Sequence, residues 1–297
     1  MSQEFNELLL SMRPEKTRTI AVANATDAAV LKSVVMANEM GFARAILCGD
    51  ALQIQTVALS AGLDISGFEI IHCDDEILAA KTAVSLVRDG RADIVMKGMI
   101  HTADLLRAVL NRDNGIRGDG VLSHVAVLYS PSRNRTLFLT DMAMVMYPDL
   151  SAKVQLIKNA VSLACHMGVQ KPLVVPLCAV ETLNPAMRAT VDADALQKMN
   201  ENGEISDCIV SGPMALDIAV SKDAARAKGI TGPIQGDADI LLFDNIETGN
   251  SVVKSMVLFG DWIFGGVIIG ARAPVIVNSR SDNEVSKLFS IACACKM

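Results

Sequence analysis

A serine, an arginine and two carboxylic acids follow one another closely near the end of the chain, in the segment Ser279-Arg280-Ser281-Asp282-Asn283-Glu284. A serine hydroxyl donates hydrogen bonds to negative charge, an arginine fork binds phosphate or carboxylate groups, and a carboxylate accepts protons. These residue types at this spacing are typical of a site that holds an anion while a proton moves. Two local explanations compete, because Ser281 with Glu284 fits a helix capping box and Arg280 alone fits a surface ion pair.

This segment lies where a strand is expected to pass into a helix. Val275 to Val277 form a short β-branched run of the kind buried in a sheet. The apolar residues that follow recur at helical spacing, at Val285, Leu288, Phe289 and Ala292. A turn between a strand and a helix offers free backbone N–H groups and the positive end of a helix dipole. We therefore expect Ser279 and Arg280 to lie in an anion-binding turn.

A second candidate anion site follows an earlier predicted strand, 93–96. Lys97-Gly98 ends that strand, and Thr102 is a favoured N-cap for the helix that comes next. Arg107 lies off the apolar stripe of this helix and near its start, so Thr102, the helix N–H groups and Arg107 would suit a phosphate. The competing interpretation is a surface ion pair between Asp104 and Arg107, three residues apart.

Strands and helices alternate along most of the chain, which predicts an α/β protein with mostly parallel sheets. The alternation breaks once, where two apolar runs at 121–129 and 136–139 are joined by a polar turn and no helix. This pattern indicates a hairpin and a domain crossover. We expect a first domain of residues 1–134 plus 281–297 and a second domain of residues 135–280.

Polar residues gather beside the strands expected in the second half. In open α/β sheets ligands bind beyond the carboxyl ends of the strands, so this clustering predicts a binding site, although turn chemistry also favours such residues. The positions are Ser211-Gly212-Pro213, Asp237 and Asp239, Asp244-Asn245, and Gly249-Asn250.

Composition excludes several classes of protein. The 297 residues are 51% hydrophobic and carry a formal charge of −6, which argues against disorder and against a nucleic-acid scaffold. The seven cysteines are scattered without a Cys-x-x-Cys pair, and the four histidines lack ligand spacing, so we expect a reducing cytoplasm and no metal. The N-terminus is acidic, unlike a signal peptide. The most apolar stretch, 263–277, is too short to span a bilayer at about 20 residues.

Seven motifs occur in a fixed order along the chain. The first has two parts, Met-Lys-Gly at 96–98 and Thr-Ala-Asp-Leu-Leu-Arg at 102–107, and the others are Leu-Thr-Asp-Met-Ala-Met at 139–144, Val-Glu-Thr-Leu-Asn-Pro at 180–185, Gly-Pro-Met-Ala-Leu-Asp at 212–217, Gly-Asp-Ala-Asp at 236–239, Thr-Gly-Asn at 248–250 and Asn-Ser-Arg at 278–280. Together they are similar to the phosphate acetyl/butyryl transferases over nearly the whole chain, and within that family to its butyryl branch.

The resemblance implies reversible transfer of a short acyl group, butyryl in this branch, between coenzyme A and inorganic phosphate. The substrates are then acyl-CoA, phosphate, acyl phosphate and CoA, with no bound cofactor and no metal. It also implies two three-layer α/β/α domains around a cleft, like those of isocitrate and isopropylmalate dehydrogenases, and a homodimer or higher homo-oligomer.

The resemblance also implies roles for individual residues. Either Asp282 or Glu284 would take the proton of the CoA thiol, and the thiolate would attack acyl phosphate directly. Ser279 would hydrogen-bond the developing charge, while Arg280, Arg107 and Thr102 would hold the phosphoryl group. The other motifs supply the expected substrate-binding residues Lys97, Gly98, Gly212, Pro213, Asp239, Gly249 and Asn250. Asp244-Asn245 departs from the Pro-Asp that the family often has, and Val145 stands where a polar residue is expected.

Other functions remain open on the sequence alone. They are a phosphate acetyltransferase, a metal-dependent decarboxylating dehydrogenase, a noncatalytic CoA-binding protein, and an enzyme that forms an acyl-cysteine at Cys178. No histidine or other base is placed beside Cys178 by sequence, so a structural role is favoured for this cysteine.

Overall fold

The computed structural model describes residues 2–297, which form two compact α/β units. Unit 1 contains the chain up to Gly120 together with Phe264–Met297, and unit 2 is Val121–Ile263. The boundaries expected at residues 134 and 280 therefore lie elsewhere. The first fell inside a hairpin whose two strands pair with each other and stay in unit 2. The boundary at residue 280 placed the two strands before Ser279 in the second domain. They belong to unit 1, because one of them pairs with β4 (Ile94–Lys97).

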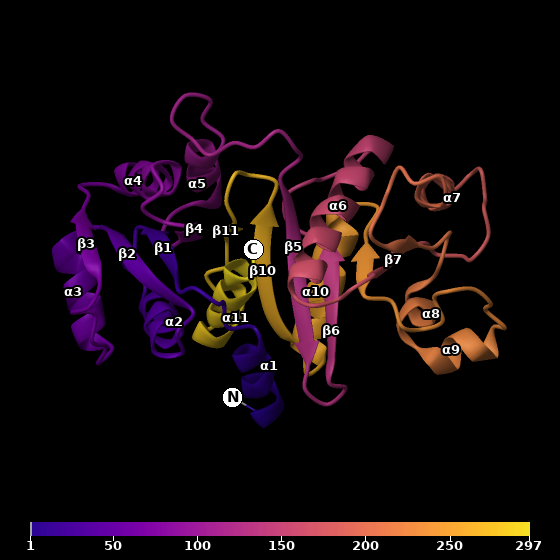
Figure 1. The fold of residues 1–297 in the computed structure, drawn as a ribbon, viewed down its shortest axis with the longest axis horizontal. Helices are drawn as coiled ribbons and strands as arrows, with labels where there is room; N and C mark the ends of the chain where they lie inside the picture. Colours follow the sequence, from indigo (N-terminus) through magenta and orange to yellow (C-terminus); the bar gives the residue numbers. More distant parts are fainter. Residues whose placement is uncertain (1) are drawn as a thin grey trace. The chain divides into compact units, whose positions relative to one another are not determined.

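Unit 1 contains a sheet in the order β3-β2-β1-β4-β11-β10 (Figure 1). Its strands besides β4 are β1 (Arg18–Ala23), β2 (Ala43–Gly49), β3 (Glu69–His72), β10 (Ile263–Ile269) and β11 (Val275–Ile276). The pairs are parallel except β10 with β11, as the βα alternation predicts. The inner strands β1 and β4 are almost wholly buried, which explains their continuous apolar sequences.

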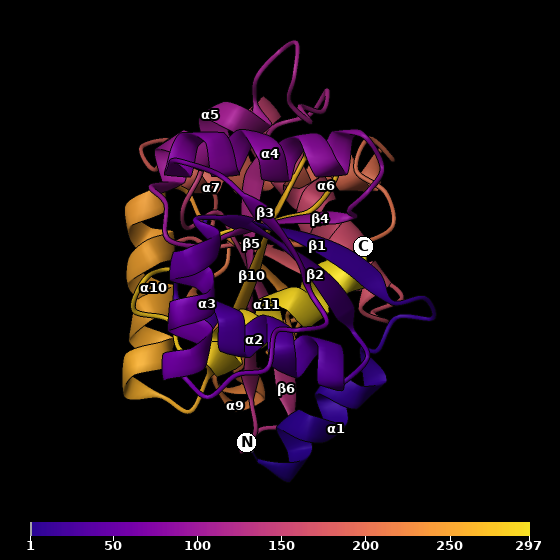
Figure 2. The ribbon, with the colours of Figure 1, turned by 90° about the vertical axis from the view of Figure 1, so that its left-hand side faces the viewer.

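Helices cover both faces of this sheet, so unit 1 has three layers. Helix α4 lies on one face, and α2, α3 and α11 lie on the other (Figure 2). Aspartate side chains begin three of these helices by accepting backbone N–H groups, at Asp27, Asp50 and Asp75. The helices are α1 (Gln3–Ser11), α2 (Ala28–Glu39), α3 (Ala51–Ser60), α4 (Glu76–Arg88), α5 (Thr102–Val109) and α11 (Glu284–Cys295).

Unit 2 contains a sheet in the order β5-β6-β9-β7-β8. Its strands are β5 (Ser123–Ser130), β6 (Arg135–Thr140), β7 (Leu173–Pro176), β8 (Ile209–Val210) and β9 (Ile240–Leu242). β5 and β6 form the expected antiparallel hairpin, and the other pairs are parallel. The helices are α6 (Leu150–His166), α7 (Arg188–Glu201), α8 (Leu216–Val220), α9 (Lys222–Ala227) and α10 (Ile246–Phe259), with α6 and α10 on opposite faces of the sheet (Figure 2).

Two local features differ from the sequence-based expectation. The helix expected over 215–227 is broken at Ser221, whose side chain accepts the N–H of Ala224 and starts α9. Helix α1 was not anticipated. Its Phe5 packs edge-on against Phe289 with ring centroids 5.3 Å apart, so tertiary contact stabilises it.

None of the helices within residues 2–297 has both the length and the apolar character needed to cross a membrane.

Candidate active site

The turn after β11 is built around the carboxylate of Asp282. Its Oδ2 accepts the backbone N–H of Ser279 at 2.9 Å and the side-chain amide of Asn278 at 3.1 Å. The Ser279 hydroxyl lies 2.9 Å from that of Ser281. Ser279 and Arg280 are both exposed. The structure thus confirms that these two residues lie in a turn between a strand and a helix, with their polar groups open to solvent.

The predicted capping box is wrong. Asn283, not Ser281, precedes α11 and accepts the N–H of Ser286 at 2.9 Å. Glu284 is the first residue of the helix, and its carboxylate bonds to Lys32 at 2.5 Å. This hydrogen bond is the main reason that the pKa of Glu284 lies below its ordinary value. The helix therefore begins two residues later than the pattern indicated. Asp282 lies in the turn, where its side chain accepts the Ser279 N–H.

A small crevice adjoins this turn, and we call it the Ser279 crevice. Lys97 and Gly98 from the end of β4, Asn278, Ser279 and Arg280 from the turn, and Lys287 from α11 line it. Lys97 is only 7% exposed, and its pKa is lowered first by burial and then by the charges of Arg280 and Lys287. Gly98 is required because a Cβ there would lie 2.1 Å from the Asn24 carbonyl oxygen. The structure thus brings together four of the predicted site residues, Lys97, Gly98, Ser279 and Arg280.

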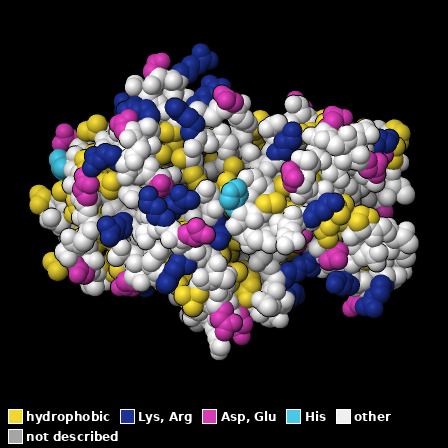
Figure 3. Space-filling view, viewed as in Figure 1, with side chains coloured by type: hydrophobic (Ala, Val, Ile, Leu, Met, Phe, Trp, Pro, Cys, Tyr) yellow, Lys and Arg dark blue, Asp and Glu magenta, His cyan; other side chains and the backbone are white. Residues whose placement is uncertain are grey.

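The predicted site on α5 lies in a different pocket. Thr102 is the first residue of the helix rather than its cap, and the preceding His101 makes no side-chain cap bond. Arg107 is exposed and pairs with Asp104, as the surface-pair interpretation stated. Both side chains line a groove of about 570 Å³ between α4 and α5, together with Lys81 and Arg88. Basic side chains gather over this part of unit 1 (upper left of Figure 3).

In unit 2, Gly249 and Asn250 lie beside a buried carboxylate that the sequence analysis did not select. Asp141 is 2% exposed and accepts backbone N–H groups of His124, Ala143 and Met144 at 2.7 to 2.9 Å. A Cβ on Gly249 would lie 2.4 Å from the Asp141 carbonyl oxygen, and Asn250 donates to the Met142 carbonyl at 3.3 Å. An aspartate directly after an apolar strand was the signal that could have identified this residue.

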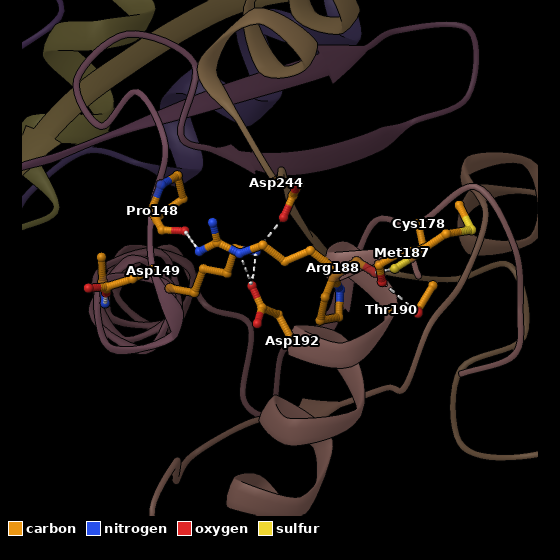
Figure 4. Close-up of polar contacts among 11 residues, drawn as sticks. Pro148, Asp149, Cys178, Met187, Arg188, Thr190, Asp192 and Asp244 are labelled. Carbon is orange, nitrogen blue, oxygen red and sulfur yellow. Dashed lines mark hydrogen bonds and ion pairs between the residues drawn. The ribbon is translucent and has the colours of Figure 1, made fainter. Parts of the chain in front are cut away.

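The sequence analysis also did not identify a buried lysine. Lys153 on α6 is 2% exposed and donates to Asp192 at 2.6 Å and to Asp244. Arg188 lies 3.5 Å from Asp192, and Asp192, Asp244 and Arg188 point toward one another in Figure 4. Asp244 lies two residues after the end of β9 and takes part in this ion-pair network. The next residue, Asn245, caps α10 by accepting the N–H of Thr248.

Two other predicted substrate residues have local structural contacts. Asp239 precedes β9 and so lies at the end of the sheet opposite to Gly249. It accepts the N–H of Leu173 at 2.8 Å, and burial raises its pKa. Gly212, followed by Pro213, comes after β8, and a Cβ on Gly212 would lie 2.5 Å from the Gln197 side-chain oxygen. Asp239 thus lies at the end of the sheet opposite to the carboxyl ends of the parallel strands, where ligands usually bind, and its role in substrate binding stays a prediction.

The thiol of Cys178 is only partly exposed, and burial raises its pKa. It lies to the side of the ion-pair network, near Met187 (Figure 4). Among the residues that the structure describes, no group of three or more His, Cys, Asp or Glu side chains is arranged to hold a metal ion.

The molecule is thus a mostly parallel α/β protein of two units, one of which presents serine, arginine and lysine around a small crevice. The profile of the family described as phosphate acetyl/butaryl transferase matches residues 4–80 and 75–295. The chain is 45% identical to a phosphate butyryltransferase of Clostridium acetobutylicum over 99% of this chain and 98% of that one. It is 36% identical to a phosphate acetyltransferase of Rhizobium meliloti over 98% of this chain and 92% of that one.

A solved structure gives the same result. The branched-chain phosphotransacylase of Enterococcus faecalis V583 superposes with a TM-score of 0.84, at 33% identity, and the match covers 94% of this chain and 98% of that one. The chain belongs to the phosphate acetyl/butyryl transferase family, and it is an acyltransferase that uses phosphate.

Proposed function

We propose that the enzyme transfers a butyryl group reversibly between coenzyme A and inorganic phosphate, without an acyl-enzyme intermediate. The observation that carries this proposal is the 45% identity to a phosphate butyryltransferase over nearly the full length, compared with 36% to a phosphate acetyltransferase. The presence of serine and arginine in an exposed turn beside a basic crevice agrees with a reaction between two anionic substrates.

Asp282 is the better candidate for the base of the two carboxylates. Its Oδ2 is held by Ser279 and Asn278, while its Oδ1 accepts no hydrogen bond within residues 2–297 and is available to a substrate proton. Glu284 is engaged by Lys32, and its lowered pKa makes it a weaker base. Asp282 also lies on the same turn as Ser279, whose hydroxyl is needed at the reacting carbonyl.

The proposed reaction toward CoA proceeds in one ternary complex. The CoA thiol gives its proton to Asp282, since a free thiol with a pKa of about 8.5 is mostly protonated at neutral pH. The thiolate sulfur then attacks the carbonyl carbon of the acyl phosphate, and the C–O bond to phosphate breaks. Ser279 donates a hydrogen bond to the oxyanion that forms at the carbonyl, and Arg280 holds the departing phosphate by its fork of N–H groups.

Arg107 and Arg280 line different pockets, and we propose that they bind different phosphate groups. Arg280 holds the transferred phosphate, whereas Arg107 contacts a phosphate of the coenzyme A nucleotide. Three basic side chains, Lys81, Arg88 and Arg107, line the groove between α4 and α5, which suits a ligand with several phosphates.

Measuring phosphate-dependent release of CoA from acetyl-, propionyl-, butyryl- and isobutyryl-CoA tests the substrate assignment. We expect the highest kcat/KM with butyryl-CoA and a decrease of about tenfold or more for acetyl-CoA. Each methylene missing from a substrate that binds in an apolar pocket lowers kcat/KM by about 10–200-fold. Phosphorus NMR of the reaction mixture identifies the acyl phosphate. Absence of phosphate-dependent turnover with all four thioesters would refute the proposal.

A preference for branched acyl groups is the second candidate, because the Enterococcus faecalis relative is named a branched-chain phosphotransacylase. A higher kcat/KM with isobutyryl-CoA than with butyryl-CoA would favour it.

We also propose that the protein works in the cytoplasm as a homodimer or a larger homo-oligomer. Light scattering of the purified protein measures the oligomeric state.

A further inference from the structure

The side chain of Asn278 has one satisfied end and one unsatisfied end. The residue is 5% exposed, and its Nδ2 donates to Asp282 at 3.1 Å and to the Ser290 hydroxyl at 3.2 Å. Its Oδ1 is buried and has no hydrogen-bond donor within residues 2–297. Reversing the amide would place Oδ1 against the Asp282 carboxylate, so the carbonyl end is the one left without a partner. A buried acceptor in this condition costs free energy until a donor reaches it.

Two buried ammonium groups line the same crevice as this amide. Lys97 is 7% exposed and has one weak acceptor, the Gly98 carbonyl at 3.4 Å, while Lys287 is 4% exposed and donates to the Asp282 carbonyl. Arg280 adds a third positive charge at the exposed rim. The carboxylates that face Lys97 are Asp27 and Asp282, and both already accept backbone N–H groups. Glu284, whose carboxylate also interacts with Lys287, is already engaged by Lys32. The cations of the crevice thus face only carboxylates that have other partners, so the crevice favours an added anion.

The size of the crevice limits what enters it. Its volume is about 10 Å³, which is room for about one water-sized atom. A tetrahedral oxyanion held by Arg280 at the rim would therefore insert a single oxygen. That oxygen would lie near the ammonium groups of the two lysines and near the Asn278 amide oxygen, which accepts hydrogen bonds. A hydroxyl group on an anion suits this position.

We infer that Lys97, Lys287 and the Asn278 amide oxygen form, with Arg280, a pocket for hydrogen phosphate that distinguishes it from oxyanions carrying no proton. This inference rests on the proposed function and specifies the form of phosphate that the site binds. Asn278 accepts the P–OH hydrogen, and the lysines neutralise the dianion. Sulfate has the same shape and charge as hydrogen phosphate at mildly alkaline pH but lacks the hydrogen, so it leaves Asn278 unpaired.

Sulfate is therefore the discriminating ligand. With butyryl-CoA as the second substrate, the inhibition constant of sulfate against phosphate is expected to exceed the KM for phosphate by about tenfold or more, because an unpaired buried acceptor is costly. Calorimetry with inorganic phosphate and sulfate, without a thioester, gives the same ratio from binding alone. Equal affinities, or binding of neither anion by a protein that still turns over, would overturn the inference. Loss of turnover with retained phosphate selectivity would instead count against the proposed reaction.

The substitution Asn278→Ala removes the acceptor and should bring the phosphate-to-sulfate ratio close to one, mainly by weakening phosphate. The matched control is Asn283→Ala, which alters the cap of α11 in the same turn without reaching the crevice, and it should keep the wild-type ratio. An unchanged ratio in Asn278→Ala would refute the role of the amide. Should that variant fail to fold, the wild-type comparison of the two anions still decides the question.

Discussion

The carboxylate of Asp282 accepts the backbone N–H of Ser279 at 2.9 Å, whereas Glu284, two residues further on, bonds to Lys32 at 2.5 Å. These two acids are near neighbours in sequence but have different partners in the structure. Asp282 shapes the turn that carries the serine and the arginine, and Glu284 ties α11 to α2. The contact between Asp282 and Ser279 thus distinguishes two acids that the sequence pattern left equivalent, and it supports our selection of Asp282 as the proposed base.

Replacing Asp282 by Asn tests this selection. An amide oxygen still accepts the Ser279 N–H and so preserves the turn, but the side chain no longer takes a proton at neutral pH. We expect kcat to decrease by about 10²–10⁴-fold with a small change in the KM for CoA. The matched control is Glu284→Gln, for which kcat should stay within about threefold of wild type. A large loss in the control with little loss in Asp282→Asn would reverse the assignment.

The hydroxyl of Ser279 should contribute mainly to the transition state. Its removal in Ser279→Ala takes away one donor to the developing oxyanion, so kcat should decrease by about 10²–10³-fold. Steady-state kinetics at saturating CoA and acyl phosphate measure this effect. Ser281→Ala is the control, since it removes the neighbouring hydroxyl at 2.9 Å while leaving Ser279 in place, and its kcat should remain near wild type.

Cys178 should not be required for turnover. Burial raises the pKa of its thiol, which makes it a poor nucleophile at neutral pH, and it lies apart from the Ser279 turn in sequence and in its contacts. We expect Cys178→Ser to keep kcat within about twofold of wild type. A loss of several orders of magnitude, or a burst of CoA release before phosphate is added, would instead support a covalent acyl-cysteine.

The buried ion-pair network of unit 2 should matter for stability. Lys153→Met leaves Asp192 and Asp244 without their shared cation, so the free energy of unfolding should decrease by about 3–5 kcal/mol. Denaturant unfolding followed by circular dichroism measures it. Lys198→Met breaks an exposed pair with Asp194 on α7 and should cost only about 0.3–0.5 kcal/mol. Similar losses of unfolding free energy in both variants would show that burial of Lys153 does not increase the contribution of its ion pairs to stability.

Asp261 should make unit 2 sensitive to acid. The Ser132 side chain, the Ser132 backbone N–H at 3.0 Å and the Ser130 hydroxyl at 2.9 Å interact with its carboxylate and lower its pKa from 3.8 to about 2. Because the folded pKa is lowered, the stabilisation is complete above pH 3.8 and is lost as the pH falls toward about 2.

Thermal unfolding across this pH range provides the measurement. Asp261→Asn should have a lower Tm than wild type at neutral pH, and the two should converge in acid. Asp223→Asn, which alters a solvent-exposed pair with Arg226, serves as the control and should follow wild type at every pH. A difference between Asp261→Asn and wild type that is constant with pH would contradict the prediction.

Much of the fold followed from local patterns. Helix α4 begins and ends at Glu76 and Arg88 as expected, because Asp75 caps it and its apolar spacing is regular. The β5–β6 hairpin was likewise predicted from two apolar runs without a helix between them. The break at Ser221 was not, because the apolar pattern continues across it while the serine side chain favours a new helix start.

The sequence by itself determined the family, the α/β alternation and the position of the Ser279–Arg280 turn, since each of these is encoded in contiguous residues. Only the tertiary structure decided which acid supports Ser279, that Lys97 and Lys287 join the turn in one crevice, and that Asp239 lies at the other end of its sheet. These outcomes depend on which segments distant in sequence lie side by side and on what each side chain is buried against, and no local pattern records either.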